Sequence, residues 1–121
     1  MSAAHSSTPP QGPPAVPEID VHRAARLAAE GVLLLDVRED AEWEAGHAPG
    51  ARHVPLAELD PASLPVGEPI VAVCRSGNRS GKASTVLAAA GHDVVNMTGG
   101  MQAWQAAGLP VQAPGGGPGS V

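Results

Sequence analysis

The only cysteine of this 121-residue chain lies in a setting that activates a thiol. Cys74 follows the apolar run at residues 70–73 and precedes a polar loop made of Arg75, Ser76, Gly77, Asn78 and Arg79. Backbone N–H groups of such a loop, and of the first turn of a following helix, stabilise an anionic sulfur, and neighbouring arginines add to the effect. The residues therefore predict a reactive thiolate at Cys74.

Several residues of this loop have an expected task. Gly77 can take a positive φ, which turns neighbouring amides toward the sulfur. Arg75 supplies positive potential where an anionic substrate would enter. Arg79 closes the loop, either by contacting substrate or, as we favour, by pairing with Asp36 at the end of the neighbouring strand. A buried structural thiol is the alternative for Cys74, and the polar loop directly after it disfavours that alternative.

Hydrophobic periodicity around the loop predicts an α/β domain. Strands are expected at residues 32–37, 51–55, 70–73 and 93–97, helices at 21–30, 39–45, 80–90 and 100–107, and one helical turn at 56–59. Strands separated by helices imply right-handed crossovers and a mainly parallel sheet with helices on both faces. Chemistry in such sheets gathers at the carboxyl ends of the strands, where Asp36 and Cys74 both fall.

The two ends of the chain differ in composition from the middle. Residues 1–17 are rich in Pro and Ser and residues 113–121 in Gly and Pro, with too little apolar mass to offset the entropy of ordering. Both segments are therefore expected to be disordered tails that flank one domain at residues 18–112.

Charge and composition exclude several classes of function. The net charge of -5 disfavours nonspecific binding to nucleic acid or to an anionic membrane, whereas Arg75, Arg79 and Lys82 form a local basic island that suits a small anionic substrate. One cysteine cannot form an internal disulfide, and neither a secretory signal nor an apolar stretch of about 18 residues is visible. We expect a cytoplasmic monomer that uses no metal or other cofactor.

Four segments together carry a resemblance to a known family. They are LDVR at residues 35–38, EWEAGHAPGA at 42–51, CRSGNRS at 74–80 and TGGMQAW at 98–104. In this order and spacing the chain resembles a single-domain rhodanese. The resemblance implies the rhodanese α/β fold, sulfur transfer through a persulfide on Cys74, and a six-residue loop whose amides converge on that sulfur.

The resemblance also implies roles for residues outside the cysteine loop. Arg38 and Glu42 match family positions with mainly structural roles. Asp36, Arg38 and Ser80 are expected to support the loop. His47 is assigned a packing role, so we do not expect a Cys–His dyad. Trp43, Trp104, Met97 and Met101 are expected in the core, since the chain has no Phe or Tyr to supply bulk.

The implied chemistry needs a sulfur donor and an acceptor from outside the chain. The Cys74 thiolate would attack the outer sulfur of a small anionic donor such as thiosulfate. No second cysteine exists to take the sulfur onward, so the acceptor would be cyanide, a thiol or a protein.

Other functions remain as alternatives. A phosphatase or arsenate reductase is disfavoured, because the phosphatase signature has five residues between cysteine and arginine and this loop has four. A nucleotide-binding loop is disfavoured, because Gly77 and Gly81 are one residue too close and Ala83 replaces the required Ser or Thr. A sulfur-relay protein and a non-enzymatic binding module of the same fold also remain, although the retained Cys74 argues against the latter.

Overall fold

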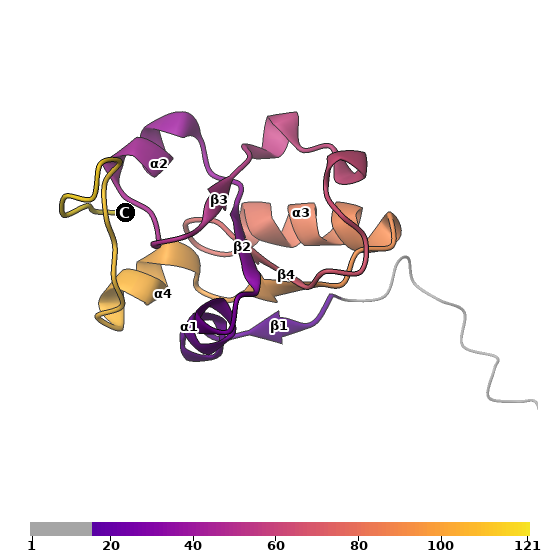
Figure 1. Cartoon of the computed structure of the whole chain (residues 1–121), viewed down its shortest axis with the longest axis horizontal. Coiled ribbons are helices and arrows are strands. Elements are labelled where there is room, and N and C mark those ends of the chain that lie inside the picture. The colour runs from indigo at the N-terminus through magenta and orange to yellow at the C-terminus, as the bar shows by residue number, and fades with distance from the viewer. Residues whose placement is uncertain (1–15) are drawn as a thin grey trace, which may run out of the picture.

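A computed structural model describes residues 16–121 and contains one sheet of five parallel strands (Figure 1). The strands are β1 (Glu18–Ile19), β2 (Leu33–Asp36), β3 (Arg52–His53), β4 (Ile70–Val73) and β5 (Val94–Met97). Their order across the sheet is β1-β5-β4-β2-β3, so β4 lies at the centre. The predicted α/β class and the parallel sheet are confirmed.

Four helices and two 3-10 turns connect the strands. The helices are α1 (Val21–Ala29), α2 (Asp40–Ala45), α3 (Asn78–Ala89) and α4 (Gly100–Ala106), and the turns are η2 (Leu56–Glu58) and η3 (Pro61–Ser63). The expected elements are all present, with boundaries that differ by at most two residues, and β1 and η3 are additional. The Asp20 side chain caps α1 by accepting a hydrogen bond from the Arg23 amide at 2.8 Å.

Helices cover both faces of the sheet and create two apolar layers. On one face, Met97 packs with residues of α1 and α4, including Met101 and Trp104. On the other face, residues of β2, β4 and β5 pack with Ala83 and Leu87 of α3. Because strand side chains alternate between faces, each central strand contributes to both layers and is buried on both sides.

The C-terminal segment differs from the expected disordered tail. The Ser120 amide donates to the Ala45 carbonyl at 2.9 Å, and Pro118 forms a β-bridge with Gln112, whose backbone exchanges two hydrogen bonds of 2.9 Å with that of His47. The Val121 side chain packs against the apolar layer of α1 and α4. Backbone hydrogen bonds and one terminal apolar side chain hold this segment in place. Neither contact can be predicted from the composition of the segment.

At the other end, the last two residues of the predicted N-terminal tail contact the domain. The Val16 side chain packs against the α3-facing layer, and the Pro17 carbonyl accepts a hydrogen bond from the Asn96 amide at 2.9 Å. The rest of the predicted N-terminal tail, residues 1–15, lies outside the described residues. Within the described part of the chain, no helix has the length and apolar character needed to cross a bilayer.

Candidate active site

Cys74 lies at the carboxyl edge of the central strand, where β4 gives way to the loop that starts α3. The parallel register places Val73, the last residue of β4, opposite Asp36, the last residue of β2. Gly77 adopts φ 108°, a left-handed conformation that a residue with a Cβ rarely takes, and α3 begins at the next residue. The chain therefore reverses around the cysteine within four residues, as the sequence predicts.

Hydrogen-bond donors converge on the buried Sγ atom. Cys74 is 1% exposed, the Gly77 amide lies 3.0 Å from Sγ, and the Ser80 hydroxyl lies 3.2 Å from it. Burial raises the pKa of the Cys74 thiol, but hydrogen bonds from the Ser80 hydroxyl and from the amides of Ser80, Gly77 and Ser76 outweigh it, so the pKa lies below its usual value. The site therefore favours the thiolate.

Helix α4 holds the outer side of the same loop. The Met101 amide donates to the Cys74 carbonyl at 2.7 Å, and the Gln102 amide donates to the Arg75 carbonyl at 3.0 Å. These bonds use the free N–H groups at the start of α4. A Cβ on Gly100 would collide with the Arg75 and Cys74 carbonyl groups, so this close approach requires glycine. With the carbonyls held by α4, the loop amides are free to face the sulfur.

The expected pairing of Arg79 with Asp36 is wrong. Arg79 instead forms a two-pronged ion pair with Glu42 of α2, with N–O distances of 2.6 and 2.8 Å. Asp36 is occupied by Arg38, whose Nε and Nη2 atoms donate to its carboxylate at 2.9–3.0 Å in a fully buried pair. Arg38 lies only two residues from Asp36 and therefore reaches that carboxylate through a local contact. Asp36 is then not available to Arg79, which binds Glu42 of α2 instead.

Other loop side chains remain open to solvent. Arg75, Ser76 and Asn78 are exposed, as is Lys82 on the second turn of α3. Among the described residues Arg75 takes part in no ion pair, whereas the charge of Arg79 is balanced by Glu42. Arg75 is therefore the loop cation whose field is not cancelled by a bonded carboxylate.

The aromatic residues near α2 form a stack. The ring of His47 stacks on Trp43 with centroids 3.7 Å apart, and the ring of His53 also stacks on Trp43, with centroids 4.7 Å apart. The Nδ1 atom of His47 lies 3.0 Å from the Trp43 carbonyl. His47 is thus engaged in packing, as expected, whereas Trp43 is only half-buried and does not belong to the two main apolar layers.

Sequence reasoning missed one residue of the site, Asn96 of β5. Its side chain contacts both Ser80 and the Gly77 carbonyl, and it is 5% exposed. The available signal was a polar residue in the middle of an otherwise apolar strand, which is unusual for a buried position. Among residues 16–121, no cluster of three or more His, Cys, Asp or Glu side chains is placed to ligate a metal.

Comparison with known proteins identifies the family. The sequence model of the family described as "Rhodanese-like domain" matches residues 21–107, which include the cysteine loop and most of the sheet. The chain belongs to the rhodanese-like domain family. A rhodanese-related protein from Thermoplasma volcanium has a similar solved structure, with a TM-score of 0.74 and 29% identity over 78% of this chain and 96% of that one.

Two curated relatives have names that concern sulfur. A protein named "Sulfurtransferase" from Allochromatium vinosum is 39% identical and is matched over 82% of this chain and 97% of its own length. The "Putative sulfur carrier protein YrkF" of Bacillus subtilis is 34% identical, matched over 74% of this chain and 51% of its own. The chain spans about half the length of several curated relatives, so its likeness to them concerns one domain.

Proposed function

We propose that this rhodanese-like chain is a sulfurtransferase that carries a sulfane sulfur as a persulfide on Cys74. The observation that carries the proposal is the convergence of the Gly77 amide and the Ser80 hydroxyl on a buried Sγ. Such preorganised donors stabilise negative charge on sulfur without a metal. The likeness to a sulfurtransferase over almost its whole length supports the same activity.

The reaction has two displacement steps at sulfur. The Cys74 thiolate attacks the outer sulfur of a donor such as thiosulfate, a new S–S bond forms, and sulfite leaves with the electron pair of the broken S–S bond. An acceptor nucleophile, cyanide or a thiolate, then attacks the terminal sulfur of the persulfide. The second S–S bond breaks, the sulfur leaves with the acceptor, and the thiolate of Cys74 is restored.

Charge at the loop favours a small anionic donor. Arg75 is exposed beside the cysteine and takes part in no ion pair among the described residues, so its field can act on the oxyanion of thiosulfate. Arg79 is already bound to Glu42 through both terminal nitrogens and is not free to clasp a phosphate. Together with the short loop, this disfavours the phosphatase and arsenate reductase alternatives.

A sulfur-carrier role is the second candidate, and the likeness to the Bacillus sulfur carrier supports it. The chain has one cysteine, so a persulfide on Cys74 cannot be resolved internally and must pass to an external partner in either role. The two candidates share the Cys74 persulfide and differ in the acceptor, which is a small molecule in the first and a protein in the second.

Intact-mass spectrometry after incubation with thiosulfate tests the shared step. We expect the wild-type protein to gain the mass of one sulfur atom and to lose it when cyanide is added, with thiocyanate as product. Cys74→Ser, whose hydroxyl is not ionised at neutral pH, is expected to gain nothing while keeping its circular dichroism spectrum. A wild-type protein that gains no sulfur, or a serine variant that transfers sulfur at a comparable rate, contradicts the proposal.

A further inference from the structure

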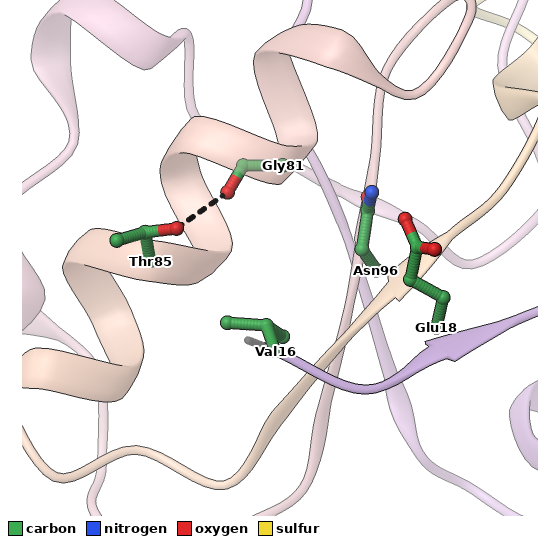
Figure 2. A pocket seen from close by; sticks show the side chains of 5 residues that line it. All are labelled: Val16, Glu18, Gly81, Thr85 and Asn96. Carbon is green, nitrogen blue, oxygen red and sulfur yellow. Dashed lines mark hydrogen bonds between the residues drawn. The ribbon is translucent and has the colours of Figure 1, made fainter. Parts of the chain in front are cut away.

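Asn96 is a buried polar residue in an apolar layer. It lies on β5 and on the same face as Val94, which packs toward α3, and only 5% of it is exposed. It lines a hollow of about 290 Å³ together with Val16, Glu18, Gly81 and Thr85. Figure 2 shows the side chains of these five residues. A buried amide without partners is costly, so its contacts explain its presence there.

Both ends of the Asn96 amide are bonded to the cysteine loop. Its Nδ2 atom donates to the Gly77 carbonyl at 3.1 Å, and its Oδ1 atom accepts from the Ser80 hydroxyl at 2.6 Å. The first contact fixes the orientation of the amide, because only the NH₂ group can face a carbonyl. Oδ1 therefore faces Ser80 and can act there only as an acceptor.

The Ser80 hydroxyl has one proton and two acceptors within reach. Sγ of Cys74 lies 3.2 Å from the hydroxyl oxygen, and Asn96 Oδ1 lies 2.6 Å from it. A single proton cannot serve both acceptors at full strength. An ionised sulfur is the stronger acceptor, whereas the amide oxygen is stronger than a neutral sulfur. The hydroxyl can therefore change partner with the charge on Sγ.

We propose that Asn96 is a positioning residue for Cys74: it anchors the Gly77 carbonyl and takes the Ser80 hydroxyl hydrogen bond whenever Sγ carries no charge. Under the proposed function on which this role rests, Sγ is charged in the resting thiolate and uncharged in the persulfide, where the charge lies on the terminal sulfur. The hydroxyl turns to Asn96 when the persulfide forms and returns to Sγ as that sulfur becomes the leaving group.

Several charged groups surround this network and are kept constant in its test. Arg79 interacts electrostatically with Cys74, Glu42 balances Arg79, and Arg75 adjoins the cysteine. The carboxylate of Glu18 lies beside the hollow that Asn96 lines. None of these groups is altered by substitutions at Asn96 or Ser80, so changes in the titration of Cys74 report on the hydrogen bonds.

The test is a double-mutant cycle read on the thiolate. Cys74 is the only cysteine, so the pH dependence of iodoacetamide alkylation gives its pKa directly. Ser80→Ala removes a donor and is expected to raise the pKa. Asn96→Leu removes the anchor of Gly77, which raises the pKa, but frees the Ser80 hydroxyl for Sγ, which lowers it. Asn96→Leu should therefore raise the pKa more in the Ser80→Ala background than in the wild type, by about half a unit or more.

Two further variants make the result decisive. Thr85→Val is the matched control, because Thr85 lines the same hollow and its hydroxyl bonds, within residues 16–121, the Gly81 carbonyl alone. The Cys74 pKa of this variant should equal that of the wild type. Asn96→Ala replaces Asn96→Leu if the larger side chain prevents folding, as judged by circular dichroism. Equal shifts in both backgrounds, or no shift in either, would overturn the proposal. This readout requires no sulfur transfer, so failure of the proposed function, seen as no mass gain with thiosulfate, is distinguished from failure of this role.

Discussion

The ion pair between Arg79 and Glu42 is a testable support of the cysteine loop. Glu42→Gln removes the charge while keeping the shape of the side chain. The amide oxygen of Gln can still accept the hydrogen bond that Glu42 receives from the Glu39 amide at 3.0 Å, which caps α2. The substitution thus isolates the contribution of the ion pair from that of the helix cap.

The size of the effect follows from the titration of Glu42. Hydrogen bonds from Arg79 above all, together with the Glu39 amide and the charges of Arg79 and Arg38, lower the pKa of Glu42 from 4.5 to about 2 against the opposing effect of burial. A shift of that size corresponds to roughly 3 kcal/mol as an upper bound. Side-chain exposures of 26% for Glu42 and 32% for Arg79 leave the pair open to solvent screening, so we expect a loss of about 1–2 kcal/mol. For a domain of this size the melting temperature should fall by roughly 5–10 °C.

Denaturant unfolding of a double-mutant cycle is the appropriate assay. Arg79→Met keeps the aliphatic stem and removes the charge, and combined with Glu42→Gln it should cost little more than either single change. Glu44→Gln is the control, since Glu44 lies on the same helix but is exposed, and it should behave additively with Arg79→Met. Additive losses for Arg79 and Glu42 would refute the reasoning.

Acid titration gives a second measurement on the same pair. The pKa of Glu42 is lower in the folded state, so its stabilisation is present above about pH 4.5 and is lost as the pH falls toward about 2. The wild type should therefore lose more stability across this interval than Glu42→Gln. Parallel acid limbs for the two proteins would show that the pair contributes nothing to folding.

Three further predictions concern neighbouring parts of the structure. Gly46→Ala should lower the melting temperature by several degrees, because the new Cβ would collide with the backbone of Ser120 and displace the C-terminal segment; an unchanged value contradicts that packing. Gly100→Ala should impair both stability and sulfur transfer. Gly108→Ala, also at positive φ but with no neighbours within 4 Å, should lower stability only through backbone strain. Equal losses of stability would contradict the inferred collision of the new Cβ at position 100 with the cysteine loop. Arg75→Ala should raise the KM for thiosulfate and weaken its salt dependence with little change in stability, and steady-state kinetics at two ionic strengths would reveal a contrary result.

Local sequence determines the cysteine loop and the elements on either side of it. The apolar run of β4, the glycine at position 77 and the polar start of α3 act over a few residues, so the strand–loop–helix transition is readable without knowledge of the fold. The parallel sheet follows from the alternation of strands and helices, which leaves few topologies. Because the loop is local in sequence, the predicted hydrogen-bond donors around Cys74 agree with the observed contacts of Gly77 and Ser80.

Tertiary structure decided which distant side chains meet at that loop. Arg79 and Glu42 are 37 residues apart, and Asp36 is unavailable because Arg38 reaches it first. Asn96 comes from the neighbouring strand, 16 residues after Ser80, and its role depends on the register of β5 beside β4. Residues 113–121 pack because the Ser120 amide donates to the Ala45 carbonyl of α2 and the Val121 side chain joins an apolar layer, although their own composition predicts disorder. Periodicity and turn chemistry encode local conformation, whereas partners across the fold are selected by geometry that exists only once the sheet has assembled.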